Sequence, residues 1–310
     1  MSRPDLDAVN EYLTALQDRV CQAFQGAEPE ARFREDPVES PGGALARTRV
    51  LEDGAVLERA AVNFTRARGD RLPSVASERH PDAAGAPFEA VSLSLIVHPR
   101  NPYAPASHMN LRFFHARRGN ASEDWWFGGG FDLTPSYGFA EDAQHWHRVA
   151  RAACAPLGPE AYPRFKKQCD AYFFLPHRGE ARGVGGLFFD DLDAGGFPLC
   201  FSFARSVGDH YLPAYLPILE RRKLTPFGER EREFQLWRRG RYVEFNLVCD
   251  RGTRYGLESG RRIESVLASL PPLVRWRYDF QPEPGSPEAR LVEEFLQPRD
   301  WLAHEPRAED

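Results

Sequence analysis

Two stretches with regular hydrophobic patterns lie in the middle of the chain. The run Val91 to His98 is rich in β-branched and aliphatic residues and ends at Pro99, which cannot donate a hydrogen bond to a sheet. In the run His108 to Ala116, apolar and polar residues alternate, as in a half-buried strand. We expect the two runs to pair as antiparallel strands with one apolar face. The other face would carry five polar side chains: Ser94, His98, His108, Asn110 and Arg112.

The rest of the chain supplies further strands and many helices. Apolar residues at helical spacing predict an N-terminal helix over residues 4 to about 24. Other helices are expected at residues 139–154, 159–174, 198–223, 228–239, 262–270 and 286–296, and other strands at 31–33, 46–51, 55–64, 183–191, 242–249 and 274–280. Early strands with hairpin-like connections, followed by interleaved helices, predict an α+β fold with a mostly antiparallel sheet covered by helices. Without a repeat or linker, residues 1–310 are predicted to form a single domain.

Composition and charge exclude several classes of protein. The net charge is −5 and no segment is strongly basic, so a nucleic-acid partner is not expected. No apolar run approaches the ~20 residues of a membrane span, and the N-terminus lacks the apolar core of a signal peptide. The five cysteines include no CxxC pair, which predicts reduced thiols in the cytoplasm and no zinc site. Phosphate-binding glycine motifs are also missing.

The predicted polar sheet face has two interpretations. It is either the solvated side of an antiparallel sheet or a site for an anion, since Ser, His, Asn and Arg suit anion recognition better than the Lys, Glu and Thr of solvated faces. Three glycines, Gly128 to Gly130, follow the aromatic pair Trp125 and Trp126. They either let the backbone approach a flat ligand closely or mark a bulge in a strand.

Other candidate residues lie outside this stretch. On the predicted helix His147 flanks the buried stripe whereas His145 faces solvent, so only His147 can belong to a site; its alternative is a structural role. In the predicted strand over residues 242–251, Asp250 shares a face with Glu244 and Asn246. Asp250 is then either a carboxylate directed into the polar face or a turn former. Two cations at the start of a later helix, Arg261 and Arg262, could bind a carboxylate ligand.

Several long motifs, in order, resemble those of one enzyme family. They are SLSLIVHPRNPYAPASHMNLRFF, WWFGGGFDLTP, EDAQHWH, YPRFKKQCDAYFFLPHRGEARGVGGLFFDDLD, RGRYVEFNLVCDRGT, SGRRIESVLASLPPLVRWRY and QPRDWL. From about residue 30 to 302 the chain resembles oxygen-dependent coproporphyrinogen III oxidase. The resemblance implies a homodimer whose large, flat antiparallel sheet lies between layers of helices. It also implies that two propionates of coproporphyrinogen III become vinyl groups, giving protoporphyrinogen IX in haem biosynthesis, with O2 as acceptor and CO2 and H2O2 released.

The same resemblance assigns roles to individual residues. It implies that His108 is the proton donor and that Asp250 is important for activity. Implied substrate contacts are Ser94, Asn110, Leu111, Arg112, Asp132, Arg251, Gly260, Arg261 and Arg262. Some bacterial members bind a divalent metal such as Mn through histidines that match His98, His108, His147 and His177, whereas other members work without metal. Residues 242–277 match a region of dimer contact. Two residues depart from the family pattern: Cys249 replaces a usual Tyr, and Arg261 a common Gly or Ser.

The chemistry leaves alternatives open. In the first, the arginines hold the carboxylates, a central carboxylate accepts pyrrole N–H bonds, and the electron-rich pyrrole reacts with O2 without a redox cofactor. In the second, a histidine-bound metal activates O2. In the third, the protein is a non-catalytic tetrapyrrole carrier.

Overall fold

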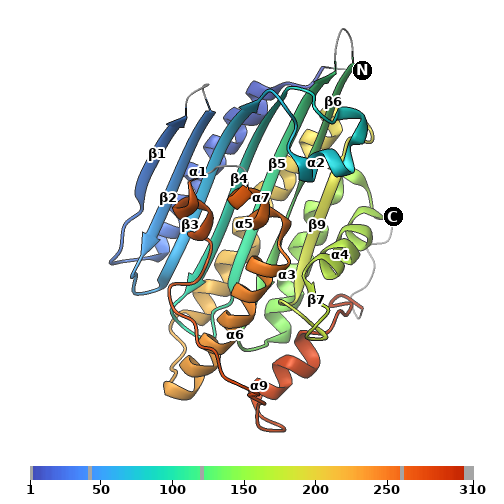
Figure 1. Ribbon diagram of the computed structural model, residues 1–310. Coiled ribbons are helices and arrows are strands. Elements are labelled where there is room, and N and C mark those ends of the chain that lie inside the picture. The colour runs from blue at the N-terminus through green and yellow to red at the C-terminus, as the bar shows by residue number, and fades with distance from the viewer. Residues whose placement is uncertain (1–2, 41–43, 119–121, 259–261, 304–310) are drawn as a thin grey trace.

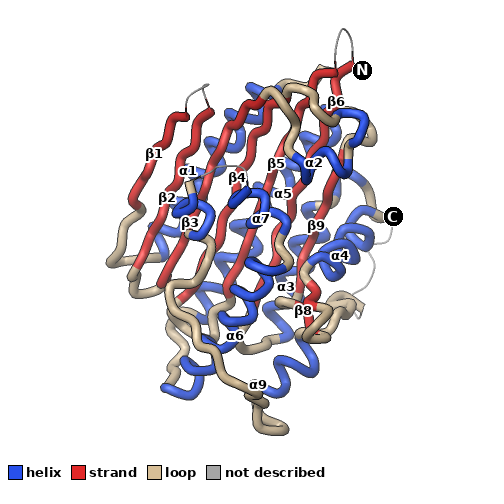
Figure 2. The backbone as a smooth tube through the Cα atoms, in the orientation of Figure 1, coloured by secondary structure: helices blue, strands red, loops and turns tan. Residues whose placement is uncertain are grey.

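The computed structural model describes residues 3–40, 44–118, 122–258 and 262–303. Its centre is a seven-stranded sheet in the order β1-β2-β3-β4-β5-β6-β9, in which all neighbours are antiparallel (Figures 1 and 2). The strands are β1 (Arg34–Ser40), β2 (Ala44–Glu52), β3 (Leu57–Gly69), β4 (Phe88–Pro99), β5 (Ala106–Arg118), β6 (Ser122–Thr134) and β9 (Gly185–Leu192). Two short strands, β7 (Phe174–Leu175) and β8 (Glu180–Ala181), pair separately. The predicted α+β fold is confirmed.

Helices lie on both faces of the sheet (Figure 1). They are α1 (Leu6–Ala27), α2 (Ser74–Arg79), α3 (Ala140–Ala153), α4 (Ala161–Tyr172), α5 (Phe197–Arg222), α6 (Glu229–Val248), α7 (Arg251–Glu258), α8 (Ile263–Leu267) and α9 (Pro287–Arg290), the last continued by a π-helical turn, Leu291–Phe295. The helices α1, α3 and α5 share the main core with the apolar face of β3 to β6. On the other face, Tyr242 of α6 packs against Ala61 and Ile96, and Ser265 of α8 bonds to Thr48 and Asn63.

The main core explains why the N-terminal helix and the central strands form as predicted. Apolar side chains of α1 recur three or four residues apart and are buried, and Asp5 caps the helix by accepting a hydrogen bond from the Ala8 backbone N–H. In β5, Met109, Leu111 and Phe113 point to this core. Burying each such large side chain contributes roughly 1.5–3 kcal/mol. The apolar face of the predicted strand pair is therefore the inner face of the sheet.

Three predicted strands are wrong. Residues 242–249 continue α6, and residues 274–280 contain no strand. Alternating residues in 242–249 predicted a strand, but the buried positions follow a helical period. Tyr242, Phe245 and Asn246 are buried at spacings of three and four, whereas Leu247 is 53% exposed. The strand expected at 31–33 lies instead at Arg34–Ser40, a polar edge strand that contains Pro37, as edge strands tolerate.

Within the described residues, no helix combines the length and apolar composition needed to cross a bilayer.

Candidate active site

The predicted pairing of the two central strands is confirmed, and their polar side chains share one face of the sheet. In the register of β4 and β5, Ser92 pairs with Arg112, Ser94 with Asn110, and Ile96 with His108. Ser94, His108, Asn110 and Arg112 are partly exposed on the face opposite the main core. We call this side of β4, β5, β6 and β9 the polar sheet face.

The three glycines lie in β6, beside these side chains. Gly128 pairs with Arg112, and a Cβ atom there would lie 2.7 Å from the Arg112 guanidinium nitrogens. At Gly130, φ is +144°, and a Cβ atom would lie 2.1 Å from the Leu187 carbonyl oxygen. The pairing of β6 with β9 also shifts register between Phe127 and Gly129. These glycines therefore form the bulged strand that was one of the two interpretations, and they make room for Arg112 to lie flat on the sheet.

A buried chain of hydrogen bonds supports His108. Its Nδ1 lies 3.0 Å from Oδ1 of Asp132 on β6, and Nη2 of Arg182 donates to both oxygens of this carboxylate at 2.8 and 2.7 Å. Arg182 Nη1 also donates to the Asn246 side-chain oxygen of α6 at 3.0 Å. Burial would raise the pKa of Asp132, but Arg182 and the His108 hydrogen bond lower it, so Asp132 is an ionised acceptor. Nδ1 of His108 must then be the donor, which leaves Nε2 free to exchange a proton with a substrate.

Arg182 is a site residue that we missed in the sequence. Its side chain is 2% exposed, and its guanidinium carbon lies 4.2 Å from the centre of the Phe173 ring and 4.8 Å from those of Tyr242 and Phe245. Burial lowers the pKa of this group, and Asp132 raises it above the ordinary value. The available signal was the expected burial of Asp132 in a strand, because a buried carboxylate needs a cation.

A second group of charges surrounds Asp190 at the β9 end of the polar sheet face. Arg112 donates from Nη2 to Asp190 at 2.6 Å and from Nη1 to the Asn110 side chain at 2.7 Å. Arg251, the first residue of α7, donates to the other Asp190 oxygen at 3.2 Å and lies over the Tyr172 ring at 4.9 Å. Two of the predicted substrate-binding arginines therefore converge, although they are far apart in sequence. Guanidinium groups bind carboxylates through paired N–H donors.

The other predicted substrate contacts do not join this group. The Leu111 side chain is 2% exposed in the main core, so it points away from the polar sheet face. Arg262 precedes α8 and pairs with Asp36 of β1, far along the sheet from β9. Gly260 and Arg261 lie outside the described residues. Of the predicted set, Ser94, Asn110, Arg112, Asp132 and Arg251 are brought to the same side.

Asp250 does not lie on a strand face, contrary to the prediction. Asp250 follows helix α6, and its Oδ2 accepts from the backbone N–H and hydroxyl of Thr253 at 2.7 and 2.8 Å. Its Oδ1 accepts from the Tyr172 hydroxyl at 2.7 Å. Glu244, expected beside it, binds Arg178 instead. These contacts make Asp250 the N-cap of α7, which agrees with the turn-forming alternative and fixes the position of its neighbour Arg251.

The four histidines expected as metal ligands are not brought together in this chain. His147 is a buried residue of α3. One of its ring nitrogens lies 2.9 Å from the Tyr162 hydroxyl and the other 2.9 Å from the Val184 carbonyl. His177 pairs with Glu244. Across the described ranges, no three His, Cys, Asp or Glu residues are grouped so that they could hold a metal ion. The donors present therefore do not fit a single four-histidine site, and the helical prediction that His147 is the buried member of its pair with His145 is confirmed.

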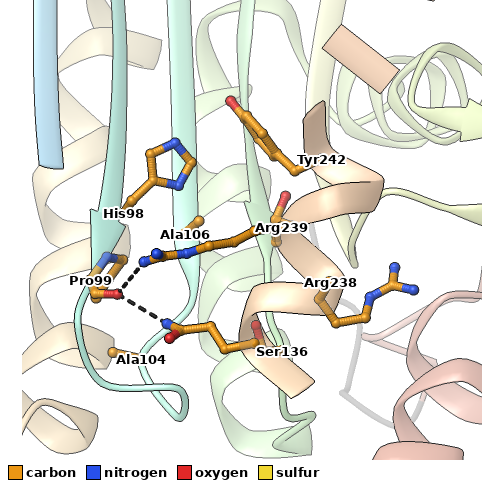
Figure 3. A pocket seen from close by; sticks show the side chains of 10 residues that line it. His98, Pro99, Ala104, Ala106, Ser136, Arg238, Arg239 and Tyr242 are labelled. Atoms are coloured by element: carbon orange, nitrogen blue, oxygen red, sulfur yellow. Dashed lines mark hydrogen bonds between the residues drawn. The ribbon is translucent and has the colours of Figure 1, made fainter. Parts of the chain in front are cut away.

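His98 lies apart, beside a small cavity (Figure 3). Its Nε2 lies 2.9 Å from the Ser269 carbonyl, and its buried Nδ1 has no hydrogen-bond partner. The cavity, about 20 Å³, is also lined by Arg238, Arg239 and Tyr242, and it is large enough for a single water molecule. Burial and the positive charge of Arg239 lower the pKa of His98 to about 3. This histidine is neutral at pH 7, and the cavity is too small for a tetrapyrrole.

These features define an α+β protein whose polar sheet face brings Arg112, Arg251 and His108 to the same side. The family model for coproporphyrinogen III oxidase matches residues 8–301. The chain therefore belongs to the coproporphyrinogen III oxidase family. It is an oxidoreductase of haem biosynthesis that acts on coproporphyrinogen III by oxidative decarboxylation.

Proposed function

We propose that the polar sheet face is the active site and that O2 is the oxidant, with no organic cofactor. The observation that carries this proposal is the chain His108–Asp132–Arg182, which lies beside the arginines around Asp190. Coproporphyrinogen III carries four propionates on a flexible ring of four pyrroles. Arg112 and Arg251 bind a propionate carboxylate, and the small residue Ser94 lets the ring approach the sheet.

The proposed reaction balances without a further redox partner. At each reacting propionate, the carbon next to the pyrrole loses a proton and two electrons, and the carboxylate leaves as CO2. The electrons of the broken bond to the carboxylate form the double bond of the vinyl group. O2 receives the two electrons and the proton, together with a second proton, and leaves as H2O2. Nε2 of His108 takes the proton of a pyrrole N–H and delivers it to the reduced oxygen as the second proton. The pyrrole nitrogen regains a proton from solvent once CO2 has left, so each propionate consumes one proton overall.

The residues around His108 prepare it for this role. The ionised Asp132 carboxylate accepts the Nδ1 proton, which fixes the ring orientation and stabilises the imidazolium after proton uptake. Arg182 neutralises this buried carboxylate and keeps it ionised. The proposed reaction uses no metal. Three of the histidines that match metal ligands elsewhere in the family, His98, His147 and His177, bind separate partners: the Ser269 carbonyl, the Tyr162 hydroxyl and Glu244.

The test of this function is turnover of coproporphyrinogen III by purified protein. Product is measured by chromatography after oxidation to the porphyrin, while an electrode follows O2. We expect the divinyl product, with one O2 consumed for each CO2 released. Binding of the porphyrinogen without O2 uptake would support the carrier alternative. Activity that disappears after chelation and returns only with a divalent ion would support the metal-dependent alternative.

We also propose a homodimer that uses the region from residue 242 to 277. Exposed apolar side chains gather in this part of the described chain: Val248 (71% exposed), Ile263 (54%), Leu273 (54%) and Trp276 (57%). Exposed apolar residues at this density are typical of protein–protein interfaces. A second copy is the expected partner because the family resemblance implies self-association through this region. Analytical ultracentrifugation of wild type and a Trp276→Glu, Ile263→Glu double variant tests it, and a monomeric wild type would refute it.

We propose the cytoplasm as the site of action. All five cysteines are free thiols, and four of them are buried. Unpaired thiols persist in a reducing compartment. Fractionation of cells that produce the protein tests this assignment.

A further inference from the structure

The short helix α2 brings one more arginine to the charge cluster around Asp190. In Figure 1, α2 lies in front of β6 and β9, on the side of the sheet that carries α7. The Arg79 guanidinium contacts both Asp190 and its neighbour Asp191. The next residue, His80, stacks on the Trp126 ring with 3.8 Å between ring centres and contacts Asp191 at 3.0 Å. The end of α2 is therefore held on the sheet, with Arg79 directed at Asp190.

The cluster contains more positive charge than its own carboxylates neutralise. Arg79, Arg112 and Arg251 all donate to Asp190, and Asp191 supplies the second carboxylate. Burial would raise the pKa of Asp190, but Arg112 and Arg79 lower it to about 2, so Asp190 is ionised at neutral pH. Three guanidinium groups against two carboxylates leave one excess positive charge.

The arginines of the cluster also keep hydrogen-bond donors free. Each guanidinium has five N–H bonds. Contacts within the described chain use two of them on Arg79, two on Arg112 and one on Arg251. The three side chains are 34%, 24% and 40% exposed, so an incoming anion can reach them. Three arginines, Arg66, Arg68 and Arg117, share Glu89 and Asp7 in the same ratio elsewhere on the surface. The cluster around Asp190 differs from that one because it lies on the polar sheet face and includes Arg112 and Arg251.

We propose that Arg79 is a third carboxylate-binding arginine of the active site. Together with Arg112 and Arg251 it binds one propionate of the porphyrinogen, and Asp190 positions the three guanidinium groups around that carboxylate. The proposal rests on the polar sheet face being the substrate site. It also gives α2 a function: this helix supplies a substrate contact from a segment that precedes the central strands in sequence.

The test uses binding as well as turnover. Coproporphyrin III, the oxidised and unreactive form of the substrate, is titrated into the protein without O2, and its fluorescence gives Kd. We expect Arg79→Gln to raise Kd and KM about tenfold, the lower end of a charge-assisted contact because the side chain is one-third exposed. Arg79→Lys keeps the charge but lacks the fork, so it should weaken binding by an intermediate factor.

Two variants separate a substrate contact from a structural role. Ser77→Ala removes the hydrogen bond that the Ser77 hydroxyl of α2 donates to the Leu72 carbonyl, but it leaves Arg79 on Asp190 and Asp191. We expect its Kd to stay within about twofold of wild type. Arg68→Gln, which alters an exposed arginine of β3 that pairs with Glu89 of β4, is the matched control and should change neither Kd nor KM. Thermal denaturation checks that each variant is folded.

Each outcome decides the proposal. Unchanged Kd in a folded Arg79→Gln variant overturns it. An equal loss of binding in Ser77→Ala also overturns it, because Arg79 would then act only by holding α2 in place. If Arg79→Gln fails to fold, the Lys variant decides, because unchanged Kd there excludes a forked contact. The proposed reaction fails separately: wild-type protein would then bind coproporphyrin III in an Arg79-dependent way but give no vinyl product.

Discussion

Replacement of Asp132 by Asn removes one charge from the buried pair that supports His108. The Asp132 and Arg182 side chains are each 2% exposed. The variant keeps the size of the side chain but leaves the Arg182 charge buried without its counter-ion. Breaking such a pair costs about 3–5 kcal/mol. For a chain of this length, an unfolding entropy of roughly 2.1 cal/mol/K per residue converts that loss to a Tm about 5–8 °C lower.

The same variant also changes the chemistry of His108. Without an ionised acceptor for Nδ1, the imidazolium that forms during proton transfer loses its stabilising charge. We expect kcat to fall by about a hundredfold or more, within the range of general acid–base catalysis. Circular dichroism during heating gives Tm, and steady-state turnover of coproporphyrinogen III gives kcat and KM. KM should change less than kcat, because Asp132 faces His108 and not the carboxylate-binding arginines.

Two further variants control this experiment. Asp209→Asn alters an exposed pair with Arg19, whose side chains are 49% and 47% exposed, and should cost less than about 1 kcal/mol. In the double variant Asp132→Asn, Arg182→Met, the unpaired charge is gone, so stability should exceed the sum of the single effects while activity stays low. If Asp132→Asn alone keeps wild-type Tm and kcat, the buried pair does not support His108 and the reasoning is refuted.

Three other predictions concern helix capping, buried histidine and carboxylate binding. Asp250→Asn should keep near-normal kcat because Asn also caps helices. Asp250→Ala should lower the free energy of unfolding by about 1 kcal/mol and raise KM, because α7 then no longer fixes Arg251. A collapse of kcat in the Asn variant would restore a catalytic role for Asp250. Burial lowers the pKa of His147 to about 3, against an ordinary value of 6.5. As pH falls below 6.5, the unfolded chain therefore binds a proton that the folded protein does not. The free energy of unfolding should fall between pH 6.5 and 3, by about 2 kcal/mol at pH 5. Urea unfolding at pH 7 and 5 should show a smaller drop for His147→Gln than for wild type, and His145→Ala, the control, should retain the full drop. Arg112→Lys should raise KM about ten- to a hundredfold, and an unchanged KM in the folded variant would remove Arg112 from the site.

Local patterns were sufficient to predict the central strands. Alternation in β4 and β5 is a property of neighbouring residues, so the shared polar face could be inferred directly. The register that pairs Ser94 with Asn110 came only from the structure. The orientation of His147 likewise followed from the helical period. In both cases one buried face is enough to fix where the polar side chains point.

Residues whose positions depend on distant contacts were harder to predict. The segment from Tyr242 to Val248 is rich in residues with high strand propensity, yet it extends α6, because Tyr242 and Phe245 then pack on the sheet and under Arg182. Asp250 therefore emerged at the start of a helix instead of the end of a strand. Arg79 and Arg182 joined the site through segments that no local pattern connects with β5 or β6. Such convergence is set by tertiary packing, which a single sequence does not encode in its local periodicity.

We propose that His108, on the polar sheet face, transfers protons in an O2-dependent decarboxylation. To test this, coproporphyrinogen III is mixed with wild-type protein and with His108→Ala without O2, and O2 is then admitted while product and gas are followed. We expect no vinyl product before O2 is admitted. Afterwards, wild type should consume one O2 for each CO2, while the folded alanine variant still binds coproporphyrin III but turns over at least a hundredfold more slowly. Vinyl product without O2, or an alanine variant as fast as wild type, would contradict the claim.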